Sequence, residues 1–238
     1  MKLKKIIVTG AGGGLGTAIC ERSAKEGFGI IAIDINADSL KSLDHLPDIE
    51  TKILDISNYN EVQSFFTQLK EDESIVALVN NAGIYNALSL LEYDEEMMDT
   101  LLNVNIKGPT ICSKFFIQHL QANNRKGKII NISSISGQEG SSDALYGLSK
   151  AAIIGLTKSL ALRFSPTVLV NAIAPTMIET KMMEKIPEWR KEEYQAHHLI
   201  KEPITAKDVA NTVHFLLSDE SSHFTGATFD LNNGGYLR

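Results

Sequence analysis

Short apolar runs that alternate with longer amphipathic stretches set the strongest limit on the fold of this 238-residue chain. The runs are rich in β-branched residues and lie at positions 6–8, 30–33, 75–79, 129–132 and 168–170. Strands that are apolar throughout must be covered on both faces, which is typical of parallel sheets. Stretches such as 14–26, 58–69 and 144–163 carry apolar residues at helical spacing. We therefore expect a doubly wound parallel α/β sheet with helices on both faces.

The alternation continues without an obvious linker or low-complexity tract, so we expect residues 1–238 to form a single domain. The one break is the stretch 176–203, which is dense in charge and precedes a helix expected near Thr205. We interpret it as a lid over a substrate pocket whose other wall is the stretch 138–144. The apolar candidates for the lid are Met177, Met182, Met183, Ile186 and Trp189, with ordinary helix core as the alternative.

Charge and cysteine content argue against several classes of partner. The formal net charge of −6 comes from mixed acidic and basic residues without a Lys/Arg block, so we expect no nucleic-acid partner. Cys20 and Cys112 are far apart and lack metal-ligand spacing, and His197 and His198 have no third ligand in view, so we expect reduced thiols and no metal site. The sequence has no apolar run of about 18 residues, and we expect a cytoplasmic protein that does not bind membranes.

A glycine-rich turn, Thr9 to Gly16, joins the first expected strand to the first expected helix. Glycines allow a close approach to a pyrophosphate, and the N–H groups at a helix start attract its charge. We expect the phosphate contacts to come from Gly10, Gly13, Gly14, Leu15 and Gly16. The turn does not spell GxGxxG, and an ordinary tight turn is the alternative. Its position nevertheless favours a Rossmann-type dinucleotide site.

Asp34 ends the second expected strand, 18 residues after Gly16. Its carboxylate can accept hydrogen bonds from both hydroxyls of an adenosine ribose and would repel a 2′-phosphate. Neither Gly13 nor Ile35 supplies a cation for such a phosphate, so we expect NAD(H) to be preferred over NADP(H). The alternative is a solvated loop aspartate. Asp55, with Ile56 beside it, could contact the adenine, or Asp55 could cap a turn.

Tyr146 and Lys150 lie four residues apart in one expected helix, so their side chains share a face. A phenol titrates near ~10, and a neighbouring ammonium favours the phenolate and lowers the phenol pKa. The pair therefore predicts a tyrosine that acts as acid and base. Taken alone, the same spacing also fits a surface contact on a helix.

Five motifs occur together in one order. They are TGxxxGxG from Thr9, NNAG at 80–83, Asn105 in NVN, Ser134 in NISS and YGLSK at 146–150. In this order and spacing the chain resembles the short-chain dehydrogenase/reductase family over nearly its whole length, with 3-oxoacyl carrier-protein reductases the nearest pattern. The resemblance implies a hydride-transferring enzyme and a homo-oligomer, a tetramer, with the apolar stretch 224–237 at a subunit contact.

The resemblance also implies roles for the catalytic residues. Tyr146 is similar to the family's general acid and base, and Lys150 to the group that lowers its pKa and holds the nicotinamide ribose. Ser134 is similar to the residue that positions the substrate oxygen, with Ser133 as a minor alternative. Asn105 is similar to the residue that anchors a proton-relay water to Lys150.

Further positions are similar to cofactor-binding residues of the family. Asn81, Ala82 and Gly83 resemble the segment on the adenine-ribose side, and Pro175, Ile178 and Thr180 resemble the contacts to the nicotinamide. A strand-end turn and a helix-capping threonine are the alternatives. The chain departs from the family pattern at Thr176, where Pro-Gly is usual, and at Asn233, where Asp-Gly-Gly is usual.

The predicted activity is NAD(H)-dependent interconversion of a carbonyl and a secondary alcohol, with a 3-oxoacyl thioester as the nearest substrate pattern. The alternatives are an S-adenosylmethionine-dependent methyltransferase and a dinucleotide-binding regulator without turnover. The first leaves Ser134, Tyr146 and Lys150 unexplained, and the complete set of motifs disfavours the second.

Overall fold

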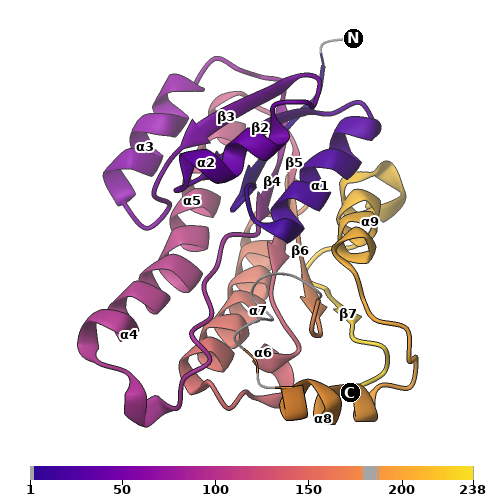
Figure 1. The fold of residues 1–238 in the computed structure, drawn as a ribbon. Helices are drawn as coiled ribbons and strands as arrows, with labels where there is room; N and C mark the ends of the chain where they lie inside the picture. Colours follow the sequence, from indigo (N-terminus) through magenta and orange to yellow (C-terminus); the bar gives the residue numbers. More distant parts are fainter. Residues whose placement is uncertain (1–2, 179–185, 187, 238) are drawn as a thin grey trace.

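A computed structural model describes residues 3–178, 186 and 188–237. Its core is a seven-stranded parallel sheet in the order β3-β2-β1-β4-β5-β6-β7 (Figure 1). The strands are β1 (Lys5–Thr9), β2 (Gly29–Asp34), β3 (Ile49–Ile53), β4 (Ile75–Asn80), β5 (Gly127–Ile132), β6 (Val168–Pro175) and β7 (Thr228–Leu231). The parallel sheet expected from the apolar runs is confirmed. Edge strands β3 and β7 are only partly buried, which explains why neither forms a clear apolar run.

Helices cover both faces of the sheet (Figure 1). They are α1 (Gly14–Lys25), α2 (Ala37–Leu40), α3 (Tyr59–Gln68), α4 (Glu95–Leu102), α5 (Gly108–Ala122), α6 (Ser136–Glu139), α7 (Ala144–Phe164), α8 (Glu188–His197) and α9 (Ala206–Leu217). Ile6 and Val8 pack with α1 and α9, whereas Ile7 packs with α3, α5 and α7. Alternate residues of a strand point to opposite faces, so β1 is buried from both sides.

The helix starts follow local sequence signals. Thr205 precedes α9, and the side chain of Asp208 accepts hydrogen bonds from its backbone N–H and its hydroxyl, which forms a capping box. This confirms the helix start expected near Thr205.

Cys20 and Cys112 are free, buried thiols, and burial raises the pKa of each to about 12. Among the described helices, none is long and apolar enough to cross a membrane.

A chain of buried polar side chains lies under the carboxyl ends of β4 and β5. Asn80 donates to Asn131 Oδ1 at 2.8 Å and to Ser113 Oγ at 3.0 Å. Asn131 in turn donates to Thr157 Oγ1 at 2.9 Å. These bonds tie two neighbouring strands to α5 and α7, and therefore fix the helices against the sheet.

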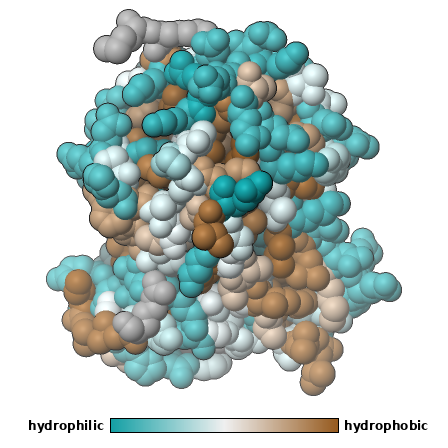
Figure 2. Space-filling model, turned by 180° about the vertical axis from the view of Figure 1, so that it is seen from behind, coloured by the Kyte–Doolittle hydropathy of each residue, from teal (hydrophilic) through white to brown (hydrophobic). Residues whose placement is uncertain are grey.

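Polar and apolar surfaces are unevenly distributed. Seen from behind, the lower part of the molecule collects apolar residues, whereas the upper part is mainly hydrophilic (Figure 2). Leu91 and Trp189 are 94% and 64% exposed. The side chain of Trp189, one of the apolar candidates for the lid, therefore points mostly into solvent from α8. Met182 and Met183 lie outside the described residues.

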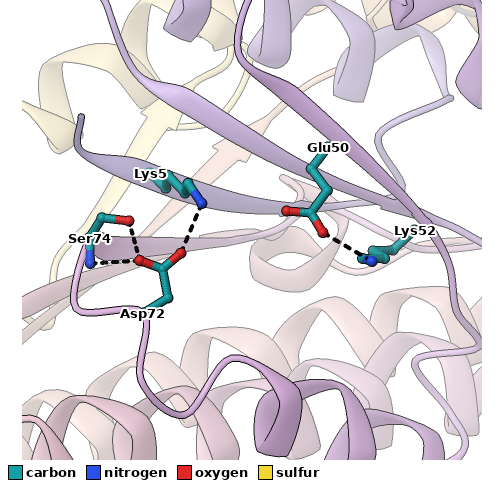
Figure 3. A network of polar contacts seen from close by, with 5 residues as sticks. All are labelled: Lys5, Glu50, Lys52, Asp72 and Ser74. Carbon is teal, nitrogen blue, oxygen red and sulfur yellow. Dashed lines mark hydrogen bonds and ion pairs between the residues drawn. The ribbon is translucent and has the colours of Figure 1, made fainter. Parts of the chain in front are cut away.

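The amino ends of β1 and β4 are joined by an ion pair at the edge opposite the candidate site. Lys5 Nζ lies 2.8 Å from Asp72 Oδ2, and the backbone N–H of Ser74 donates to Asp72 Oδ1 at 3.1 Å (Figure 3). Burial raises the pKa of Asp72, but the hydrogen bonds from Lys5 and Ser74 outweigh it and hold this pKa well below its usual range. On β3, Glu50 and Lys52 form a second pair at 3.0 Å (Figure 3).

Candidate active site

The carboxyl ends of the strands surround a cavity of about 950 Å³. It opens where the chain order reverses between β1 and β4, which is the usual ligand position in doubly wound sheets. The structure brings most of the predicted residues to its wall. These are Gly10, Gly13, Gly14, Leu15, Gly16, Asp34, Asp55, Ile56, Asn81, Ala82, Gly83, Ser134, Tyr146, Lys150, Pro175 and Ile178. Thr180 lies outside the described residues.

The glycine-rich turn passes very close to the end of β4. Gly10 has φ +63°, and a Cβ there would lie 2.7 Å from Ala82 Cα, so this position requires glycine. Gly13 precedes α1 without a capping side chain. The N–H groups in the first turn of α1 have no partner within the helix, which makes this end of the cavity suited to a pyrophosphate.

Asp34 lines the cavity and also binds the backbone of the glycine-rich turn. Its Oδ2 accepts a hydrogen bond from Gly12 N at 3.0 Å, and its Oδ1 accepts one from Asn36 N at 3.0 Å. Ile35, also on the cavity wall, is 69% exposed. The carboxylate is therefore oriented by the backbone, and the side chain next to it in sequence is uncharged.

Asn81 connects the ends of β1 and β4. Its Nδ2 donates to the carbonyl oxygens of Thr9 and Gly10, both at 3.0 Å. The N–H groups of Asn81 and Ala82 donate to Thr9 Oγ1 at 3.1 and 3.2 Å. This side chain therefore shapes the cavity by holding its two halves together.

Asp55 both caps a turn and lines the cavity. Its Oδ1 accepts hydrogen bonds from the N–H and hydroxyl of Ser57 at 2.9 and 2.7 Å. The two interpretations left open for Asp55 are thus compatible. Ile56 beside it is buried and also lines the cavity.

Tyr146 and Lys150 lie on one face of α7, as the spacing predicts. Lys150 Nζ is 5.6 Å from the centre of the Tyr146 ring and donates to the carbonyl of Ile132 at 3.0 Å. Asp143 caps the helix, because its Oδ1 accepts a hydrogen bond from Tyr146 N at 3.0 Å. The start of α7 at Asp143 and the face on which Tyr146 lies together place the phenol in the cavity.

Ser134 and Ser133 differ in what their hydroxyl groups contact. Ser133 Oγ donates to the carbonyl of Lys150 at 2.7 Å, so it is committed to the backbone of α7. Ser134 Oγ accepts from Ser136 N at 3.1 Å, and its side chain is near enough to the phenol of Tyr146 to lower the pKa of that group. The geometry therefore favours Ser134 as the hydroxyl that acts beside Tyr146.

Asn105 lies behind the cavity in a π-helical segment, Asn103–Lys107. Its Oδ1 accepts from Ile84 N at 2.8 Å, and its Nδ2 donates to Ile84 O at 2.9 Å and Ser149 Oγ at 3.1 Å. A Cβ built on Gly83 would lie 3.4 Å from both Asn105 Oδ1 and Lys150 Nζ. Both groups therefore flank the same point, although Asn105 itself is buried. Single π-helical turns occur often at functional sites.

The protonation behaviour of Tyr146 differs from the sequence expectation. Its pKa is raised to about 12, mainly by burial and also by the charges of Tyr85 and Asp143, while the neighbouring Ser134 side chain lowers it. Burial also lowers the pKa of Lys150 to about 8. In the chain alone the pKa of Tyr146 is therefore raised and not lowered, because the loss of water around the phenol is the largest effect on it.

Tyr85 and Asp143 contribute to the site but were not predicted from the sequence. The rings of Tyr85 and Tyr146 meet edge to face with their centres 4.8 Å apart, and both line the cavity. Asp143 directly precedes a strongly helical stretch, so the usual signal of an N-cap could have identified it. Tyr85 carries no comparable signal, because its contact depends on how the loop after β4 folds back.

Comparisons with known proteins cover nearly the whole chain. A family model described as enoyl-(acyl carrier protein) reductase matches residues 10–236. The 3-oxoacyl-(acyl-carrier-protein) reductase FabG of Thermotoga maritima is 34% identical over 97% of both chains. Among solved structures, 4-hydroxyisoleucine dehydrogenase complexed with NADH has a TM-score of 0.91, and ElxO with NADP bound has 0.87. Each of these two is 29% identical and matches over 98% of both chains.

The two similar structures carry different dinucleotides, so the comparisons support a nicotinamide dinucleotide cofactor in general. The relatives are named dehydrogenases and reductases, and their agreement extends from the glycine-rich turn to the last strand. On these grounds the chain belongs to the short-chain dehydrogenase/reductase family of oxidoreductases.

Proposed function

We propose that this protein reduces a carbonyl to a secondary alcohol, and catalyses the reverse reaction, with NAD(H) as cofactor. The observation that carries this proposal is the convergence of Ser134, Tyr146 and Lys150 in one cavity whose other end holds Asp34 and the start of α1. Proton-transfer groups and dinucleotide-binding groups thus share one space.

The cavity fits a nicotinamide dinucleotide from end to end. The turn at Gly10 and the N–H groups of α1 suit the pyrophosphate, Asp34 suits the adenosine ribose, and Lys150 suits the nicotinamide ribose. Pro175 and Ile178 would flank the nicotinamide. When bound, the cofactor supplies or accepts the hydride.

The chain's own residues would manage the proton. Ser134 would donate a hydrogen bond to the substrate oxygen and orient it toward Tyr146. Because burial raises the Tyr146 pKa to about 12, the phenol is protonated at neutral pH and suited to donate. Lys150 would stabilise the phenolate that remains and then give up a proton to restore the phenol, and Asn105 would hold the water that returns a proton to Lys150.

The preference for NAD(H) is supported by the same end of the cavity. Asp34 would face a 2′-phosphate of like charge, and Ile35 offers no compensating cation. We propose a ketone-bearing substrate of the 3-oxoacyl thioester kind, as named for the Thermotoga maritima relative. Met177, Ile186 and Tyr194 line the cavity within the stretch 176–203, and support its role as a substrate cover.

Turnover assays test this proposal directly. The panel would contain 3-oxoacyl thioesters, enoyl thioesters, simple ketones and sugars, each with NADH and NADPH. The enoyl arm is included because of the description of the matching family model. We expect the 3-oxoacyl thioester to be reduced, and Tyr146→Phe to lose at least ~100-fold in kcat while NADH binding, followed by protein fluorescence, changes little. Lys150→Ala should impair both.

Two results would contradict the proposal. Near-normal turnover in Tyr146→Phe would show that the proton comes from another group. Tight binding of S-adenosylmethionine without an NADH response would favour a methyltransferase, and NADH binding without turnover across the panel would favour a regulator.

A further inference from the structure

Thr176 and His198 form a buried polar contact between the cavity wall and the residue that follows α8. Thr176 Oγ1 lies 3.2 Å from His198 Nε2, and the two residues are only 6% and 8% exposed. Thr176 comes directly after β6, where its N–H donates to Leu231 O at 3.0 Å, and it also lines the cavity. Thr176 therefore lines the candidate site and also contacts the residue that follows α8.

His198 is held tightly in this position. Its N–H donates to Gln195 O at 3.2 Å, and a Cβ on Gly235 would lie only 2.8 Å from the Cδ2 atom of its ring. Burial lowers the pKa of His198, and the charges of Lys201 and His197 lower it further. A neutral imidazole can accept a hydrogen bond from the Thr176 hydroxyl.

Asn233 fixes the residues that follow His198. Its carbonyl accepts hydrogen bonds from Leu199 N at 2.8 Å and Ile200 N at 3.1 Å. Its side-chain Nδ2 donates to Glu202 O at 2.7 Å. The stretch 198–202 is therefore attached at one end to Thr176 and along its length to Asn233.

Thr176 and Asn233 are two of the positions at which the sequence departs from the pattern of the family that it resembles. A glycine at position 176 would have no hydroxyl to contact His198. An aspartate at position 233 would have no side-chain N–H to donate to Glu202 O. The two departures thus supply the two side-chain contacts that hold the same stretch.

We propose that Thr176, His198 and Asn233 are positioning residues that fix the stretch 198–202 against the end of β6 and so set the shape of the nicotinamide end of the cavity. This inference rests on the proposed function. It implies that Thr176 acts through the geometry of the dinucleotide site, while the proton transfer remains with Tyr146.

The test compares side chains that keep or remove the contact. Thr176→Val and His198→Leu remove it, whereas Thr176→Ser and His198→Gln keep a polar group in place. We expect each removal to raise the KM and Kd for NADH about five- to tenfold, with kcat within about twofold, and each conservative variant to stay near wild type. Because both side chains make the same contact, the double variant Thr176→Val/His198→Leu should lose no more NADH affinity than either single variant.

Asn233→Asp should cause a smaller rise in KM, since it removes only the contact with Glu202. Thr212→Val is the matched control, because the Thr212 hydroxyl donates to Asp208 O within α9, away from the cavity. A fall in melting temperature with unchanged NADH affinity would overturn the inference, as would fully additive losses. Direct NADH titration keeps the test independent of turnover, so a failure of the proposed reaction would be recognised separately.

Discussion

The hydroxyl of Tyr93 lies 3.0 and 2.9 Å from the two carboxylate oxygens of Asp143. Asp143 is 1% exposed and also accepts hydrogen bonds from Tyr146 N at 3.0 Å and Leu88 N at 3.4 Å. Burial and the Asp143 carboxylate together raise the pKa of Tyr93 to about 12. This contact joins the loop after β4 to the start of α7, the helix that carries Tyr146.

Tyr93→Phe should therefore destabilise the fold. Removing the hydroxyl leaves a buried carboxylate with one donor fewer, and we expect a loss of about 1–3 kcal/mol in the free energy of unfolding, measured in urea. Tyr59→Phe is the matched control, because the Tyr59 hydroxyl contacts Lys114 at an exposed site and its loss should change stability by less than about 0.5 kcal/mol. Equal stability losses in the two variants would contradict the importance of the buried contact.

Because of Lys150, the free energy of unfolding should change with pH in the alkaline range. Below pH 8 it is protonated in both the folded and the unfolded chain, and the full cost of burying its charge is present. Its pKa is about 8 in the folded chain against an ordinary 10.5, so between these values only the unfolded chain binds the proton, and stability rises with pH. Across this interval the free energy of unfolding should rise by about 3 kcal/mol.

Urea unfolding of wild type and Lys150→Met at pH 7.5, 8.5 and 9.5 would measure this effect. The variant should lack the part of the rise that comes from Lys150, while the contributions of other groups, including the half-buried Lys128, remain in both proteins. Parallel pH curves for the two proteins would show that Lys150 keeps its ordinary pKa in the folded chain.

Cofactor preference should follow the charge beside the adenosine ribose. The variant Asp34→Ala/Ile35→Arg removes a carboxylate and adds a guanidinium that can pair with a phosphate. Its ratio of kcat/KM for NADPH over NADH should rise at least about tenfold, which corresponds to ~1.4 kcal/mol. Asp34→Ala alone separates lost repulsion from gained attraction. A wild-type protein that used NADPH better than NADH would contradict the assignment of Asp34.

The surface around β7 should form a subunit contact. Phe224, Phe215 and Phe229 pack edge to face with centres 5.3 to 6.2 Å apart, and Phe224 is 41% exposed beside an edge strand. We expect sedimentation of wild type to show a tetramer at micromolar concentration, and Phe224→Ser to shift it toward smaller species at an unchanged melting temperature. A monomeric wild type would refute this.

Much of the fold was predictable because its central strands are apolar on both faces. The runs at 6–8 and 129–132 mark β1 and β5 directly, and the glycine-rich turn marks the start of α1. Residues 49–53 and 228–231 form edge strands with mixed side chains, so their sequence gives a weaker signal.

The candidate site was predictable where neighbours in sequence determine the chemistry. Tyr146 and Lys150 share a helix face and Asp34 ends a strand, so their spacing predicted their positions, while their roles came from the order of the five motifs. The Tyr93–Asp143 contact joins residues 50 positions apart and depends on loop packing. The Tyr146 pKa depends on how far the folded chain excludes water, which spacing cannot give.

The buried chain from Asn80 through Asn131 to Thr157 allows α7 one position along the sheet. A slip by one helical turn, about 5.4 Å, would part Thr157 from Asn131 and leave a buried amide hydrogen without its acceptor. We therefore expect α7 not to slide during turnover, so that Tyr146 and Lys150 stay fixed relative to β5. Adaptation to substrates of different size then falls to the loops after β4 and β6. Enzymes built in this way can therefore differ in these loops, and so in their substrates, while Tyr146 and Lys150 keep their positions.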